Sequence, residues 1–250
     1  NYIAQDVDVL IVFPMSGEAL SSAIDQARDA GVKVICMVNL TKNWDAAMES
    51  SNEMIAGAVC QMASDWADER FPDAGAGEVK VALVGLTTNQ NSSEYWDVLQ
   101  TVEDYNEKFE VVVTKECAND LPEDGMKMAE DLYVTNPEVN VFVCCSGNNA
   151  LGINNYYSSM NSPVDDLSVL GVFGINGGAE TYDAIIASGE DKAVYRGMAV
   201  AAGIVPSVEE MLELATGLLD GTFTEPEHRW AQVYSVTAVN AAEYKALNVG

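Results

Sequence analysis

The chain alternates between short runs rich in valine and isoleucine and segments whose apolar residues recur every three or four positions. The short runs predict strands that are buried on both faces, at Val7–Phe13, Val32–Val38, Val79–Leu86, Phe109–Thr114, Val139–Cys144, Leu167–Phe173 and Ala193–Tyr195. The periodic segments predict helices, at Ala19–Ala30, Met54–Trp66, Ser93–Lys108, Glu123–Asn136, Ala150–Met160, Ala179–Ala187 and Ala199–Asp220. Strands that alternate with helices over short links favour an α/β fold with parallel sheets.

Composition and charge exclude several classes of protein. The 250 residues carry 12 Lys+Arg against 39 Asp+Glu, a formal net charge of −27, and 48% of them are apolar. This apolar content excludes a disordered chain. Because no lysines or arginines cluster, we expect no nucleic-acid partner and no binding to an anionic membrane surface. The longest apolar runs fall far short of the roughly 18 residues that a membrane span needs.

The cysteines and the single histidine give no sign of a metal site. Five cysteines, an odd number, contain no C-x-x-C spacing, and His228 is the only histidine. We therefore predict no metal site and no cofactor, and we interpret the thiols as small apolar core residues.

Four stretches along the chain carry a more specific signal. They are, in order, Val9–Pro14 with Ala19-Leu20 and Ala30–Ile35; Ser50–Asn52 with Gly57; Val141–Val143 through Asn149–Gly152; and Val169–Gly177 with Ala184-Ile185 and Gly189. In this order and spacing they resemble the type I periplasmic solute-binding proteins, within them the ribose- and galactose-binding branch that serves ATP-driven sugar importers. The resemblance extends over roughly 240 residues.

The resemblance implies a fold of two Rossmann-like lobes with parallel sheets, joined by three crossovers around a hinged interlobe cleft. Lobe one is expected at residues 1–50 and 199–227, and lobe two at residues 51–198 and 228–250. In the family, further strands and helices precede the stretch that begins here at Tyr2. We therefore expect lobe one to be incomplete at the N-terminus, and the native product to be longer by about 50 residues, as judged from βαβ dimensions.

The ligand positions that the resemblance implies for lobe one are Phe13, Asn39 and Ser50. The family's acidic residue at the end of the second strand falls near Val38 in this chain, and the next residue is Asn39. Lobe one therefore lacks that carboxylate. Trp44 lies in the next loop, where an indole can stack on a sugar face. The alternative for Trp44 is that it packs on its own lobe.

The ligand positions implied for lobe two follow predicted strands, and they are Asn89, Asn91, Glu94, Ser146, Asn148, Asn176 and Arg196. Asn176 replaces the family's aspartate and keeps a hydrogen-bond acceptor. Each position has a structural alternative. The asparagines at 89, 91 and 148 can cap helices, Asn176 can be an ordinary turn residue, and Arg196 can form an ion pair with an acidic neighbour.

The resemblance implies a protein that is not an enzyme. It would bind a small polar ligand, most simply a sugar, and present it to an ABC permease in the membrane, as an extracellular or periplasmic protein or a cell-surface lipoprotein, and as a monomer if the chain is complete. The alternative on the same fold is a sensor domain that passes ligand occupancy to a signalling partner. A repressor of the lactose type conflicts with the −27 charge. An enzyme on a doubly wound sheet would lack the phosphate-binding G-x-G-x-x-G.

Overall fold

The computed structural model describes residues 2–14, 17–18, 20–86, 90–201 and 204–248. The chain divides into two compact units. Unit 1 comprises Asn1–Ser51 and Ala201–Gln232, and unit 2 comprises Asn52–Val200 and Val233–Gly250. The chain therefore passes from one unit to the other three times. In the described part of the chain, no helix combines the length and the apolar character that a membrane span requires.

Unit 1 contains a four-stranded sheet in the order β1-β2-β3-β9. The strands are β1 (Val9–Val12), β2 (Lys33–Val38), β3 (Ala46–Glu49) and β9 (Glu227–Trp230), after a short 3-10 helix at Tyr2–Gln5. All neighbouring pairs are parallel, with Ile11 opposite Ile35, Ile35 opposite Ala46, and Ala46 opposite Glu227. All four strands therefore end at the same edge of the sheet.

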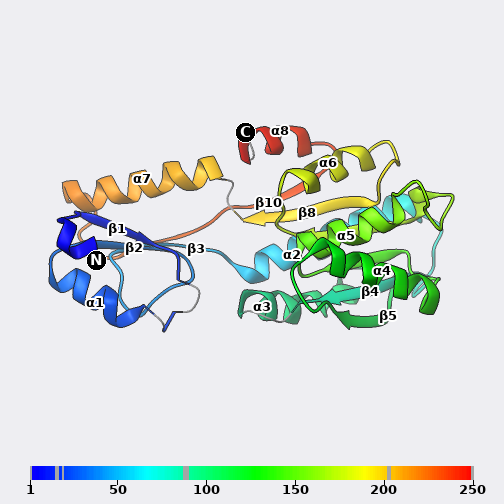
Figure 1. Cartoon of the computed structure of the whole chain (residues 1–250), viewed down its shortest axis with the longest axis horizontal. Coiled ribbons are helices and arrows are strands. Elements are labelled where there is room, and N and C mark those ends of the chain that lie inside the picture. Colours follow the sequence, from blue (N-terminus) through cyan, green and yellow to red (C-terminus); the bar gives the residue numbers. More distant parts are fainter. Residues whose placement is uncertain (1, 15–16, 19, 87–89, 202–203, 249–250) are drawn as a thin grey trace. The chain divides into compact units, whose positions relative to one another are not determined.

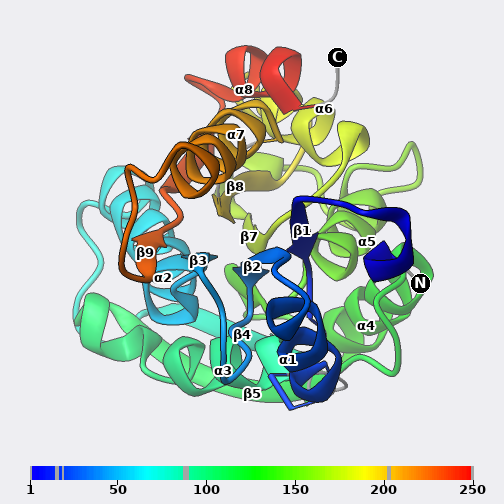
Figure 2. The same ribbon diagram turned by 90° about the vertical axis from the view of Figure 1, so that its left-hand side faces the viewer.

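One helix covers each face of this sheet (Figures 1 and 2). Helix α1 (Ser21–Asp29) packs Ile24 and Ala27 against β2 residues such as Val34. Helix α7 (Ile204–Asp220) packs Met211, Leu214 and Leu218 against the other face, which Ile35 and Met48 form. The two helices contact alternate residues of β2, because successive side chains of a strand point to opposite faces of the sheet.

Unit 2 contains a six-stranded sheet in the order β10-β8-β7-β6-β4-β5. The strands are β4 (Val79–Gly85), β5 (Phe109–Glu116), β6 (Val141–Cys144), β7 (Gly171–Ile175), β8 (Tyr195–Ala201) and β10 (Val233–Thr237). The neighbouring strands β5, β4, β6, β7 and β8 pair in parallel in that order across the sheet. Val84 lies opposite Cys144, and Ile175 lies opposite Ala199. These five strands therefore share one carboxyl edge.

Helices cover both faces of the unit 2 sheet (Figure 1). They are α2 (Asn52–Arg70), α3 (Gln90–Leu99), α4 (Pro122–Thr135), α5 (Gly147–Tyr157), α6 (Ala179–Ser188) and α8 (Ala241–Asn248), with 3-10 turns at Val102–Tyr105 and Leu167–Val169. Helices α4, α5 and α6 share a core with Phe142 and Val172. Trp66 of α2 meets Phe173, the next residue of β7, edge-on at 6.0 Å between ring centroids. Alternate residues of β7 thus face opposite helical layers.

Helices α4 and α5 approach each other backbone to backbone near their N-termini. A Cβ atom at Gly125 would overlap the carbonyl oxygen of Asn149, and one at Gly152 would overlap the carbonyl oxygen of Pro122. Only glycine permits this approach, so these two positions fix how the starts of α4 and α5 lie against each other.

The structure corrects several predicted boundaries. Residues 228–230, which we assigned to lobe two, pair with β3 and so lie in unit 1. The strand predicted at Leu167–Phe173 begins only at Gly171. The strand predicted at Ala193–Tyr195 instead runs from Tyr195 to Ala201, so the following helix begins at Ile204 rather than Ala199. The helix predicted at Ser93–Lys108 ends at Leu99.

Strands β3, β9 and β10 and helix α8 were not predicted. β3 reads Ala-Ala-Met-Glu, a sequence with good helix propensity, and it becomes a strand because it is paired on both sides. Asp45 holds the start of β3 beside β2. Its carboxylate accepts hydrogen bonds from the Val34 N–H at 2.9 Å and from two nitrogens of Arg28 at 3.2 Å each. Such tertiary contacts are invisible in a local sequence pattern.

The contact between α4 and α5 predicts a position-specific cost for an added methyl group. Gly152→Ala should lower the free energy of unfolding by about 1–3 kcal/mol, because a backbone carbonyl must move to make room. Gly75→Ala is the matched control, because the nearest atom to its added methyl group is a Glu78 side-chain carbon at 3.6 Å. Urea unfolding followed by circular dichroism measures both. Equal midpoints for the two variants would contradict the proposed role of Gly152.

Candidate functional site

A pocket of about 220 Å³ lies at the carboxyl edge of the unit 2 sheet. It is lined by Leu86, Tyr95, Asp120, Cys145, Ser146, Gly147, Asn148, Ile175, Asn176 and Gly177. Ile175 ends β7, Tyr95 comes from the middle of α3, and the others follow the ends of β4, β5, β6 and β7 or begin α5. In open α/β sheets, ligands bind outside the carboxyl ends of the strands, so this pocket is the candidate site.

Ser146 links the start of α5 to the neighbouring loop. It has extended backbone angles as the N-cap residue, and its Oγ accepts hydrogen bonds from the N–H groups of Asn148 at 3.1 Å and Asn149 at 3.3 Å. Its hydroxyl donates to Asp120 Oδ1. Ser146 thus accepts hydrogen bonds from two N–H groups that have no partner within the helix. It also orients the Asp120 carboxylate.

Two asparagines hold the loop that carries Asp120. The Asn149 side chain, only 1% exposed, donates from Nδ2 to the carbonyl oxygens of Asn119 and Leu121, both at 3.0 Å. Asn148 Nδ2 donates to the intervening carbonyl of Asp120 at 3.4 Å. Three consecutive carbonyls are thereby bound to one helical turn, so the backbone that presents the Asp120 carboxylate is fixed.

Asn176 is held in an unusual conformation at the end of β7. Its φ is 56°, in the left-handed region that asparagine tolerates better than most residues, and its N–H donates to the Ala199 carbonyl at 2.9 Å. A Cβ at Gly147 would overlap the Asn176 carbonyl oxygen, so the start of α5 lies directly against this turn. The Asn176 side chain hydrogen-bonds the hydroxyl of Tyr95.

Tyr95 closes the pocket from α3. Its side chain is 7% exposed, and burial together with the nearby charge of Glu94 raises the pKa of its hydroxyl to about 12. The phenol therefore stays neutral at physiological pH. It serves as a hydrogen-bonding partner and an apolar wall, not as a base.

Of the three predicted residues near α3, the structure describes the side chain of Glu94 alone, and it does not line the pocket. Glu94 is exposed, and its carboxylate accepts a hydrogen bond from the side chain of Asn52 at the start of α2. Asn89 lies outside the described residues. Asn91 lies in α3, and its side chain is likewise outside the described part of the structure.

Arg196 lies away from the pocket, near the start of β8. Its guanidinium donates to the carbonyls of Leu170 (3.0 Å), Ser188 (2.6 Å) and Leu167 (2.6 Å) and to Asp191 (2.8 Å). It also lies over the Trp66 ring, 5.7 Å from the centroid. The structure thus separates Arg196 from Ser146, Asn148 and Asn176, and the ion-pair alternative describes it.

The predicted residues of unit 1 lie along the carboxyl edge of that unit's own sheet. Phe13, Asn39 and Ser50 directly follow β1, β2 and β3, and Phe13 is 57% exposed. Asn39 Nδ2 donates to the Pro14 carbonyl at 3.0 Å and so joins the loops after β1 and β2. Val38 before it has a φ of 66°, a strained value for a β-branched residue.

Trp44 belongs to the core of unit 1. It packs on the cluster beneath α1, and its ring lies 6.0 Å from that of His228. His228 in turn bonds Glu49 through Nε2 at 2.9 Å and meets Trp230 edge-on at 5.0 Å between centroids. Trp44 thus packs on its own unit while half-buried, and its stacking on a sugar stays a prediction.

Comparison with known proteins identifies the family. A sequence model described as "Periplasmic binding protein domain" matches residues 1–222. The chain belongs to this family. Periplasmic binding proteins bind solutes outside the cytoplasm and form a class without catalytic activity. No curated protein sequence matches the chain significantly.

Solved periplasmic binding proteins share the fold at low sequence identity. The 5-methylthioribose transporter solute-binding protein from Thermotoga lettingae is 16% identical with a TM-score of 0.72, and the match covers 99% of this chain and 73% of that one. The Caulobacter myo-inositol-binding protein is 18% identical with a TM-score of 0.69, over 98% of this chain and 78% of that one. A carbohydrate transporter solute-binding protein from Agrobacterium radiobacter, in complex with D-arabinose, is 16% identical with a TM-score of 0.71, over 98% and 80%.

The sequence interpretation missed three residues of this periplasmic binding protein's pocket region, namely Tyr95, Asp120 and Asn149. Asp120 had a signal, because Asn119–Pro122 is a polar turn directly between a predicted strand and a predicted helix. Tyr95 lies inside a predicted helical segment, and Asn149 lies directly before one, where a polar residue has the character of an ordinary helix or cap residue. Only the packed structure shows what these two side chains bond.

The chemistry of the pocket is hydrogen bonding. Among the described residues, no group of three or more His, Cys, Asp or Glu side chains is placed to hold a metal ion. Cys145 lines the pocket, and burial raises the pKa of its thiol to about 12. A protonated, buried thiol is a poor nucleophile.

The burial of the cysteines predicts slow thiol chemistry. All five are buried and none forms a disulfide, and burial also raises the pKa of Cys60 to about 12 and of Cys117 to about 11. A pKa near 12 leaves only about one thiolate in ten thousand at pH 8, so labelling by Ellman's reagent should be slow and should accelerate as pH rises. In guanidinium the unfolded protein should react with Ellman's reagent at all five thiols. Rapid labelling of the folded protein at pH 8 would contradict this burial.

Proposed function

We propose that this protein binds a sugar or a similar small polyol and delivers it to an ABC permease. The observation that carries the proposal is the set of groups at the unit 2 pocket. Asp120, Asn148 and Asn176 offer a carboxylate and two carboxamides at the carboxyl ends of parallel strands. Carboxylates and carboxamides match the paired donor and acceptor character of hydroxyl groups.

The size of the pocket supports a small ligand. Its volume of about 220 Å³ lies below the roughly 300–1,000 Å³ of pockets that take drug-sized molecules. The related proteins of similar fold are described as binding 5-methylthioribose, myo-inositol and D-arabinose, all small and polyhydroxylated. A monosaccharide or cyclitol is the ligand class that fits both observations.

The chemistry of the same residues supports binding without turnover. General acid–base or nucleophilic catalysis needs a paired acid and base or an activated nucleophile. The described lining residues include one carboxylate, a neutral tyrosine and a protonated thiol. We therefore propose that the protein is not an enzyme. On the family match we also propose that it is extracellular or periplasmic or a cell-surface lipoprotein, and that it is a monomer if the chain is complete.

A thermal-shift screen tests the proposed ligand class. A ligand present at a hundredfold excess over Kd should stabilise the protein by about 2.7 kcal/mol, equivalent to a rise in Tm of about 5–10 °C. The panel should contain aldopentoses, aldohexoses and inositols, with amino acids and purine nucleosides as matched negative classes. Mass spectrometry of small molecules released from the native protein is the second readout. A shift with a negative class and none with any polyol would refute the sugar proposal.

Asn176 is the residue whose removal tests the pocket itself. Asn176→Gly deletes the carboxamide and tolerates the φ of 56° without strain. For the polyol with the largest thermal shift, calorimetry should show binding weakened by about 1–3 kcal/mol, because a ligand hydroxyl loses its partner. Asn161→Gly, at an exposed position after α5, is the control and should leave affinity unchanged. Unchanged affinity in a folded Asn176→Gly protein would remove Asn176 from the site.

A further inference from the structure

The charge around the pocket is entirely of one sign. Asp120 is the only charged residue among those that line it. All 12 lysines and arginines of the chain lie within the described residues, and none of them lines the pocket. The three on elements next to the pocket are engaged elsewhere, since Lys80 pairs with Glu110, Lys115 with Asp131, and Lys127 with Asp124 at 3.9 Å.

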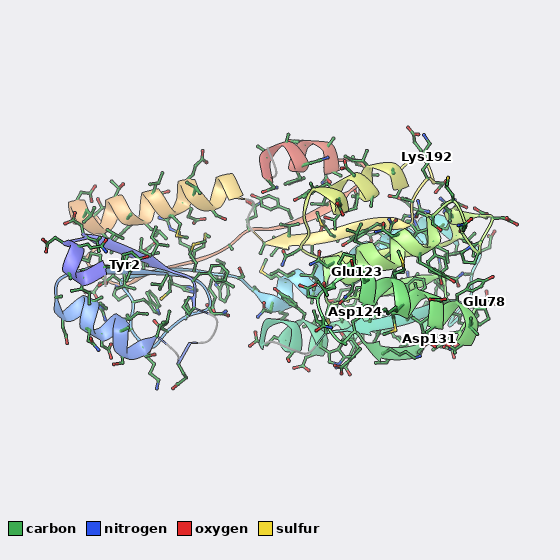
Figure 3. The ribbon with its side chains drawn as sticks, viewed as in Figure 1. Tyr2, Glu78, Glu123, Asp124, Asp131 and Lys192 are labelled. Atoms are coloured by element: carbon green, nitrogen blue, oxygen red, sulfur yellow. The ribbon has the colours of Figure 1, made fainter. Side chains whose placement is uncertain are left out.

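Helix N-termini usually attract anions, but three of those around the pocket, at α4, α5 and α6, already have acceptors from the chain itself. The first N–H groups of α5 bond the Ser146 side chain. Helix α4 begins with a proline, which has no N–H, and carries Glu123 and Asp124 in its first turn (Figure 3). Helix α6 carries Glu180 in its first turn. At α4, α5 and α6 the positive end of the helix dipole is thus matched by acceptors from the chain itself.

The Asp120 carboxylate keeps capacity for a ligand. Its Oδ1 accepts the Ser146 hydroxyl, a neutral donor, and no ion pair of the described residues involves it. The side chain is exposed, while its backbone is fixed by Asn148 and Asn149. A fixed carboxylate with a neutral partner in a pocket without cations attracts a cationic group, and charge-assisted hydrogen bonds are about twice as strong as neutral ones.

We propose that the site selects its ligand by charge, through Asp120. It takes a polyhydroxylated ring that carries a protonated amino group, as in an amino sugar or an inosamine, and it rejects the carboxylate and phosphate analogues. Asp120 bonds the ammonium group directly, and Asn148 and Asn149 position it. This inference rests on the proposed function, since it names the substrate class of the same pocket.

Matched ligands that differ in one charged substituent test the selection. The series are D-glucose, D-glucosamine and D-glucuronate; the corresponding galacto compounds; and myo-inositol, an inosamine and an inositol monophosphate. Calorimetry at pH 7 in low salt should show the amine form binding at least about tenfold more tightly than the neutral form. The anionic form should bind more weakly than either, and added salt should narrow these differences.

Two variants of the full chain assign the selection to one residue. Asp120→Asn keeps an acceptor for the Ser146 hydroxyl and removes the charge, so the preference for the amine should fall about tenfold while the neutral form changes less than about threefold. Asp73→Asn removes the same charge at an exposed loop position and should leave every affinity as it is. Circular dichroism checks that both variants fold.

The outcomes separate the two proposals. If the neutral polyol binds and the amine binds no more tightly, the charge selection is wrong and the proposed function stands. The same conclusion follows if Asp120→Asn keeps the amine preference, or if an anionic form binds most tightly. If no polyol of any series binds, both proposals fail.

Discussion

The first turn of α5 is the contact on which the rest of the unit 2 pocket depends. It has no side chain at Gly147, so its backbone lies against the Asn176 carbonyl, and its Gly152 lies against Pro122 one turn further on. Ser146, Asn148 and Asn149 then bond the loop after β5. One helical turn thereby sets the distance between the end of β7 and the Asp120 loop.

The sequence predicted the strands that are apolar runs and missed the strands that are not. β4 and β7 are apolar runs buried on both faces, and their valine- and isoleucine-rich composition marks them. β9 reads Glu-His-Arg-Trp and lies at a sheet edge, so half of its side chains face solvent and no apolar run marks it. β3 depends on the bonds that Asp45 makes to β2, which are contacts across the fold. Elements whose stability comes from pairing, not from their own burial, leave little trace in the sequence.

Three predicted residues line the unit 2 pocket, namely Ser146, Asn148 and Asn176, and each follows a strand end within four residues. Arg196 shows the limit of that reasoning. It was assigned to the end of a strand because its strand was placed too early, whereas β8 begins at Tyr195 and continues to Ala201. A shift of a few residues moved it from the carboxyl edge to the amino edge, where backbone carbonyls satisfy its guanidinium. Function assigned by strand position is therefore only as good as the strand boundaries.

The three passages of the chain between its units have a consequence for how the protein is made. Unit 1 is completed by α7 and β9, and unit 2 by β10 and α8, so residues 204–248 contribute to both. During synthesis neither sheet has all its strands, and neither core all its helices, until this last part of the chain has emerged. Domains that finish early fold while the ribosome is still working. Here the same segment, residues 204–248, supplies the last elements of both units, so the two sheets are completed by one stretch of chain.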